Sequence, residues 1–200
     1  MTNTLARQFY LKPPTPASVT RFLQYQSNQP FSYKEIGATA TTPPTGYLVD
    51  HNRVQLGHGV AVYQQACTAL ARWEMFKLGW LQLCWPTTPI TVGATVGVLA
   101  QVLGGQILNA CRIVYTVDQE TAAGARFGFA YGTLPGHVER GEERFLIEWR
   151  QQDDTVWYDI LAFSQPQHWL VRLGYPVTRF FQKRFAQCSK IAMQKAIHSK

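Results

Sequence analysis

Residues 127–149 read FGFAYGTLPGHVERGEERFLIEW and carry the clearest structural signal in the chain. Aromatic residues first alternate with glycine and alanine, a Pro-Gly pair follows, and an acidic segment leads into a second alternating segment. Alternation with a period of two is typical of a half-buried β-strand, and Pro-Gly is a frequent turn pair. These residues therefore predict two strands joined by an acidic loop.

Strand signals continue on both sides of this segment. Segments with strand character, each bounded by turn residues, lie near residues 90–102, 107–118, 125–133, 142–150 and 154–163. Their spacing of roughly 10 to 18 residues favours an antiparallel meander over alternating strands and helices. Further upstream, residues 47–57 predict one more strand, and residues 57–78 predict a helix with a single apolar face.

The two ends of the chain predict helices of different length. Residues 1–30 read as a loosely packed lead-in, in which Thr15 as N-cap and Pro16 predict a short helix to about Ser27. At the other end, apolar residues at spacings of three and four predict a long helix from about Tyr175 to Ile197. Pro176 separates it from a short helical turn before it.

This order of elements predicts a single helix-grip domain over residues 31–200. The class is α+β, with a curved antiparallel sheet of six to seven strands wrapped around the long C-terminal helix. A sheet bent this strongly cannot close its concave side against one helix. An apolar cavity between sheet and helix is therefore expected, and cavities of this kind commonly bind small molecules.

Composition excludes several classes of protein. The chain has 200 residues, of which 46% are hydrophobic, so it is expected to fold rather than to be disordered. The N-terminus lacks the apolar core of a secretory signal, and residues 78–111, although uncharged, are interrupted by proline and glycine and favour buried strands over a membrane span. The cysteines are far apart, which favours reduced thiols and a cytoplasmic protein; they are Cys67, Cys84, Cys111 and Cys188.

The positive charge is concentrated at the C-terminus. Residues 1–165 carry 12 basic and 12 acidic side chains, whereas residues 166–200 carry seven basic side chains and no acidic one. A cationic stripe is formed by Arg172, Arg179, Lys183 and Lys190. The stripe is a solvated helix face, a contact for an anionic membrane surface or a surface for interaction with another protein. Nucleic acid is not expected as a partner, because no recognisable binding module accompanies the stripe.

The chain resembles the uncharacterised protein family 0548 over roughly residues 30–197. The resemblance rests on FSYKEIGAT (31–39), GHGVAVYQQACTALARW (57–73), GFAYGTLPGHVERGEERF (128–145), TVWYDILAFSQP (155–166) and the Arg-rich terminal helix. Members of that family are similar in layout to START-related and pollen-allergen helix-grip proteins, which often bind lipids, sterols or other apolar molecules. The resemblance implies a fold and a ligand class but no reaction.

The candidate ligand-binding residues are aromatic side chains together with a polar group in the acidic loop. They are Trp73, Phe127, Phe129, Tyr131, His137, Glu139 and Trp157. The aromatic residues are equally consistent with an ordinary core, and the charged loop with simple solvation. In a second hypothesis the protein is an enzyme whose acid–base groups are Tyr131, His137 and Glu139, with the histidine held by a carboxylate and titrating near neutral pH. No motif assigns catalytic residues.

Metal and cofactor sites are not expected. The scattered histidines His51, His58, His168 and His198 have no cysteine, aspartate or histidine at ligand spacing. Phosphate-binding glycine loops and the GxSxG nucleophile motif are also absent from the sequence. The leading hypothesis is therefore a protein that holds an apolar or lipid-like ligand between the sheet and the C-terminal helix.

Overall fold

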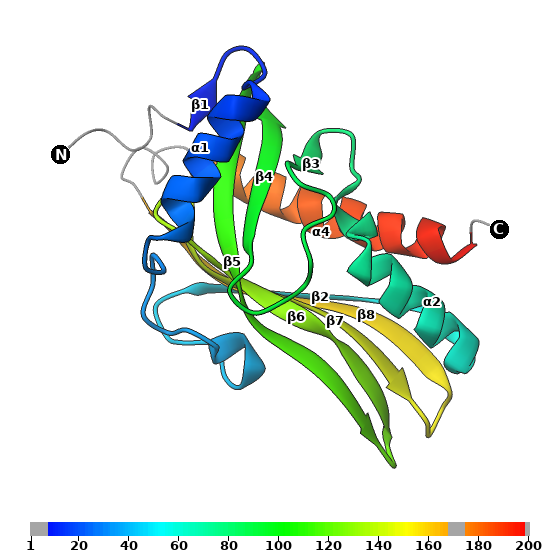
Figure 1. Cartoon of the computed structure of the whole chain (residues 1–200). Helices are drawn as coiled ribbons and strands as arrows, with labels where there is room; N and C mark the ends of the chain where they lie inside the picture. Colours follow the sequence, from blue (N-terminus) through cyan, green and yellow to red (C-terminus); the bar gives the residue numbers. More distant parts are fainter. Residues whose placement is uncertain (1–7, 168–174, 199–200) are drawn as a thin grey trace.

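The computed structural model describes residues 8–167 and 175–198. One curled antiparallel sheet forms the body, with helices α2 and α4 on its concave side and α1 on its outer side (Figure 1). The strands are β1 (Phe9–Tyr10), β2 (Leu48–His58), β3 (Leu81–Leu83), β4 (Thr95–Val102), β5 (Gly105–Thr121), β6 (Gly124–Thr133), β7 (Glu139–Arg150) and β8 (Thr155–Pro166). The helices are α1 (Pro16–Ser27), η2 (Ala38–Ala40), α2 (Gly59–Ala71), η3 (Glu74–Phe76) and α4 (Tyr175–His198).

The order of strands across the sheet is β2-β8-β7-β6-β5-β4-β3, with the short β1 paired to β5. Every pair is antiparallel. The meander of β4 to β8 follows from the short connections between strands, because such connections place consecutive strands side by side. Together with the long helix α4, this topology confirms the predicted helix-grip fold.

Two predicted boundaries are wrong. The helix expected over residues 57–78 ends at Ala71, because Trp73 adopts a left-handed backbone conformation (φ 57°) and leads into the short η3. The strand expected over residues 90–102 begins only at Thr95. The predicted helix near Pro16–Ser27 is confirmed, with Thr15 as its N-cap.

Helix α4 begins at Tyr175, so that Pro176 falls at a position where a helix tolerates proline. Pro176 lies in the first turn, where its missing N–H group has no helical partner to lose, so the helix runs on to His198. The short helical turn expected before Pro176 lies outside the described residues. The hydroxyl groups of Tyr158 in β8 and Ser189 in α4 are 2.8 Å apart, which ties the helix to the sheet.

Aromatic side chains fill part of the space between sheet and helices. Trp73, Phe76, Phe129 and Phe145 are fully buried there, and their ring centroids lie 4.9 to 5.7 Å apart in edge-to-face and tilted pairs. Phe185 of α4 packs against the same rings. The part of the interior near α2 and η3 is therefore solid core.

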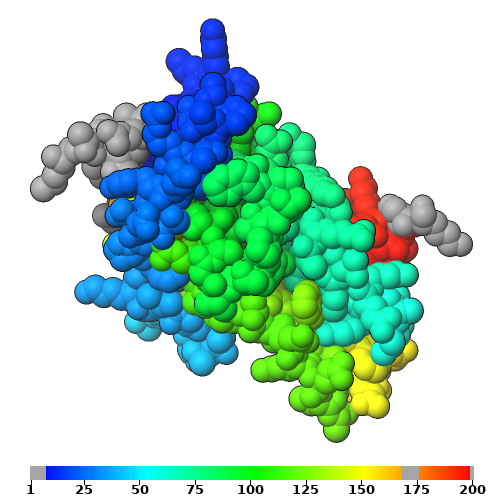
Figure 2. All heavy atoms as spheres, viewed as in Figure 1, coloured from blue at the N-terminus to red at the C-terminus, as the bar shows by residue number. Residues whose placement is uncertain are grey.

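The outer face of the sheet is covered as well. Leu23 of α1 is buried against a second apolar cluster that includes Leu99 and Leu108 of β4 and β5. Figure 2 shows α1, in blue, packed directly against the green region of the chain, to which β4 and β5 belong. One face of α1 is thus packed on the sheet, whereas most other described residues of the lead-in are exposed.

Residues 31–41 form a strap over the outer face, and Glu142 of β7 anchors it. The carboxylate accepts hydrogen bonds from the Tyr33 hydroxyl group (2.7 Å), from the backbone N–H groups of Gly37 (2.7 Å) and Thr39 (3.0 Å), and from the Thr39 hydroxyl group. A Cβ atom at Gly132 would lie 2.1 Å from the Tyr33 hydroxyl oxygen, so only glycine fits beneath the strap. The sequence motifs at 31–39 and 128–145 therefore pack against each other in the folded protein.

Candidate functional site

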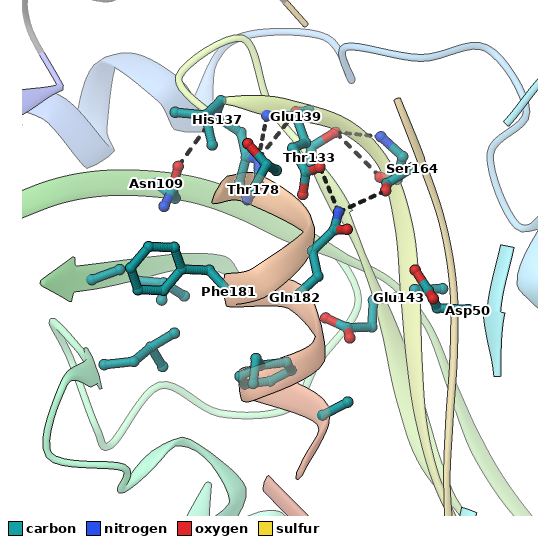
Figure 3. A pocket seen from close by; sticks show the side chains of 18 of the residues that line it. Asp50, Asn109, Thr133, His137, Glu139, Glu143, Ser164, Thr178, Phe181 and Gln182 are labelled. Atoms are coloured by element: carbon teal, nitrogen blue, oxygen red, sulfur yellow. Dashed lines mark hydrogen bonds between the residues drawn. The ribbon is translucent and has the colours of Figure 1, made fainter. Parts of the chain in front are cut away.

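A cavity of about 620 Å³ lies between the concave face of the sheet and the first half of α4 (Figure 3). One wall is apolar, because alternate residues of β4 point the same way. This wall consists of Val98, Ala100 and Val102 of β4, Ile107 of β5, Trp80, and Phe181 and Phe185 of α4. The indole N–H of Trp80 is buried and has no hydrogen-bond partner among the described residues.

The opposite end of the cavity is polar, and Glu143 lies at its centre. Glu143 of β7 pairs with Tyr131 of β6 across the sheet, and the Tyr131 hydroxyl group donates to Oε2 of Glu143 (2.8 Å). Burial, reinforced by the nearby carboxylates of Glu139 and Asp50, raises the pKa of Glu143 to about 7. Near neutral pH this carboxyl group therefore exchanges a proton readily.

Glu139 is the second acidic group of the polar end. It opens β7, and the side-chain amide of Gln182 in α4 donates to its Oε1. Gln182 also reaches Ser164 of β8 (3.1 Å), and Figure 3 shows its side chain extending from α4 toward these strands. Burial raises the pKa of Glu139 to about 7, against the opposing effects of Gln182 and Arg179.

An ion pair lies beside these carboxylates. The Arg179 guanidinium group donates to both oxygens of Asp50 in β2, with 2.8 Å between Nη2 and Oδ1. The pair joins the start of α4 to the edge strand of the sheet. Only 19% of the Arg179 side chain is exposed.

The cationic stripe is divided by this arrangement. Arg179 points to Asp50 rather than outward, which contradicts its expected place on an exposed anion-binding surface. Lys183 is exposed at the cavity rim, Lys190 is half-buried, and Arg172 lies outside the described residues. Contact with an anionic membrane surface stays a prediction.

His137 does not have the environment that acid–base catalysis near neutral pH requires. It lines the cavity, but its Nδ1 accepts a hydrogen bond from the backbone N–H of Glu139 (3.0 Å) rather than contacting a carboxylate. Burial lowers the pKa of His137 to about 4. The imidazole is therefore neutral under physiological conditions, and the groups that titrate near pH 7 are Glu139 and Glu143.

The predicted ligand residues fall into three places. Tyr131, His137 and Glu139 line the cavity. Trp73, Phe127 and Phe129 belong to the aromatic core beside it. Trp157 lies on the outer face under the Arg53 guanidinium group, 4.7 Å from its carbon to the ring centroid, so it is not part of the cavity.

Sequence reasoning missed several residues of the polar end. Glu143 is not one of them: it belongs to the same acidic group in the sequence as Glu139, and the two share a face because they are four residues apart in one strand. Asp50, Asn109 and Gln182 come from other strands and from α4, and no local pattern marks them. Their placement depends on strand order and on the rotation of the helix.

Other kinds of site receive no support from the described residues. Within residues 8–167 and 175–198, no group of three or more histidine, cysteine, aspartate or glutamate side chains is arranged to hold a metal ion. No described helix combines the length and apolar character needed to cross a membrane. All four cysteines are free thiols, and burial raises the pKa of Cys111 in the cavity wall.

Comparisons with solved structures find similar layouts at low sequence identity. A crystal structure of Ara h 8.0201 is 9% identical, with a TM-score of 0.47, and the match covers 78% of this chain and all of that one. A norcoclaurine synthase from Thalictrum flavum is 13% identical, with a TM-score of 0.43, over 76% of this chain and 98% of that one.

Sequence relatives are much closer. A UPF0548 protein from Dictyostelium discoideum is 38% identical over 96% of both chains. Another from Deinococcus radiodurans is 36% identical over 90% of this chain and 93% of its own. Residues 32–191 match the family model described as a domain of unknown function, DUF1990. The chain therefore belongs to the UPF0548 family, which carries the DUF1990 domain.

Proposed function

We propose that this protein binds a small molecule in the cavity between the sheet and α4. The observation that carries the proposal is the composition of the wall: an apolar surface on one side and a few convergent polar groups at one end. Binding sites for small molecules combine these two features in volumes of roughly 300 to 1,000 Å³, and the cavity measures about 620 Å³.

The polar end supports the same conclusion on energetic grounds. Burying a carboxyl group without a full set of partners destabilises the folded state, so a structural role alone does not account for Glu139 and Glu143. A bound molecule with polar atoms beside these carboxyl groups would offset this penalty.

Native mass spectrometry of protein purified without detergent tests the proposal, with and without added decyl-chain compounds. We expect the wild type to carry a bound compound and the variant Ala100→Phe to lose it, because the new ring fills the apolar wall. Ala122→Phe, at an exposed position, is the matched control. Equal binding by Ala100→Phe and the wild type would contradict the proposal.

A second candidate function is acid–base catalysis in the same cavity. The observation that favours it is the Tyr131–Glu143 pair, a hydroxyl group and a carboxyl group in contact, whose glutamate has a pKa of about 7. Once a bound compound is known, its conversion can be followed with the wild type and with Glu143→Gln. Recovery of unchanged compound from the wild type would restrict the role to binding.

A further inference from the structure

The polar end of the cavity carries more negative than positive groups. Asp50, Glu139 and Glu143 all line this end, and the negative charge of Asp50 helps to raise the pKa values of both glutamates. Arg179 faces them from α4, but both of its terminal nitrogens are engaged by Asp50. Among the described residues, no other cationic side chain forms an ion pair with this group, and Lys183 is exposed at the rim.

The two glutamates also retain unused hydrogen-bonding capacity. A carboxylate has about four acceptor positions. Among the described residues, Glu143 accepts from the Tyr131 hydroxyl group and Glu139 from the Gln182 amide. The second N–H of that amide is already directed to Ser164 (3.1 Å), so Gln182 has no donor left for Glu143. The remaining acceptor positions face the cavity.

We infer that the ligand carries a protonated amine, which binds at the polar end lined by Glu139 and Glu143, while its apolar part lies along β4 and Phe181. This inference rests on the proposed function and names the chemical class of the ligand. An ammonium group supplies a positive charge and up to three donors, which the two glutamates lack. An anionic head group would be repelled by the same carboxylates, and an alcohol would gain no charge attraction.

Several groups that surround the two glutamates have pKa values shifted away from the range between pH 6 and 8. Burial lowers the pKa of His137 to about 4, and burial raises those of Tyr131, Tyr158 and Cys111 well above their usual values. Asp50 and Arg179 are paired with each other, and Glu142 is bound on the outer face. Proton release by Glu139 and Glu143 is thus expected to dominate the pH dependence of binding.

Isothermal titration calorimetry of the full chain with decylamine, decanol and decanoate at pH 8 separates the head groups at constant chain length. We expect decylamine to bind about tenfold to a hundredfold more tightly than decanol, and decanoate most weakly. Glu143→Gln and Glu139→Gln should each remove most of this preference, whereas the exposed control Glu120→Gln should leave it intact.

The pH dependence gives a second readout. An ammonium ion binds the ionised glutamates, so the affinity for decylamine should rise about tenfold or more from pH 6 to 8 and should stay flat in the double variant Glu139→Gln/Glu143→Gln. If decanol or decanoate binds as tightly as decylamine or more tightly, or if the affinity for decylamine falls as the pH rises, the ligand is not an amine, but the proposal that the cavity binds a small molecule stands. If none of the three compounds binds, both proposals are contradicted.

Discussion

Glu142 and Glu143 are neighbours in β7 but face opposite sides of the sheet, and their surroundings differ completely. On the outer face, Glu142 accepts hydrogen bonds from the hydroxyl groups of Tyr33 and Thr39 and from two backbone N–H groups. On the inner face, Glu143 has one hydrogen-bond donor among the described residues, the Tyr131 hydroxyl group. The first carboxylate holds a strap in place, whereas the second is left for another molecule.

The largest expected effect is the loss of Glu142. Glu142→Ala leaves the donors of residues 33–39 buried without an acceptor, so we expect a loss of about 3 kcal/mol or more in the free energy of unfolding. Urea denaturation measures it, with Glu120→Ala as the exposed control. A loss no larger than that of Glu143→Ala would remove the contrast between the two faces.

The next effect concerns the pH dependence of stability. Because the folded-state pKa of Glu143 is raised to about 7, the folded protein binds more protons than the unfolded chain between about pH 4.5 and 7. Stability contributed by the protonated group is complete below that window and is lost as the pH rises through it.

The free energy of unfolding of the wild type should therefore fall between pH 5 and 8, and it should fall by about 1 to 2 kcal/mol less in Glu143→Gln. This figure allows for the contact of Glu143 with solvent in the cavity. Urea denaturation of both proteins at the two pH values gives the comparison. An identical pH dependence in the variant and the wild type would show that Glu143 titrates normally.

The two tyrosines that donate to these glutamates provide a matched pair. Tyr33→Phe removes one donor from a fully coordinated carboxylate, and we expect it to cost about 1 to 2 kcal/mol. Tyr131→Phe should cost less, about 0.5 to 1 kcal/mol, because Glu143 can take up a proton instead. Urea denaturation at pH 7 ranks them, and the reverse order would contradict the account.

The smallest expected effect is local. Asp50→Asn breaks the ion pair that holds the start of α4 over the inner face, so backbone amides of residues 179–183 should exchange hydrogen faster. Global stability should fall by only about 1 kcal/mol. Hydrogen exchange followed by mass spectrometry measures the first effect. Unchanged exchange there would show that the pair does not hold the start of α4 in place.

Much of this architecture could be predicted from the sequence, because it depends on local patterns. Alternation in residues 127–149 predicts which residues share a face, and apolar spacing predicts α4. The sequence could not predict on which side of the sheet Trp157 lies, because both faces of this sheet are covered. Strand parity cannot distinguish a face under a strap from a face under a helix.

The polar end of the cavity illustrates the second limit. Tyr131 meets Glu143 only because β6 and β7 pair in one particular register, and Gln182 reaches Glu139 only because α4 has one particular rotation. Register and rotation are set by packing over the whole sheet rather than by neighbouring residues. Sequence patterns therefore located Tyr131, Glu139 and Glu143 but not their contacts with one another or with α4.

Carbon-detected NMR of the glutamate side chains, recorded between pH 4 and 9 with and without decylamine, shows whether the polar end is an amine site. We expect the carboxyl groups of Glu139 and Glu143 to titrate near 7 in the free protein and at clearly lower pH when the amine is bound. Titration near 4.5 for both groups, unchanged by the amine, would contradict this expectation.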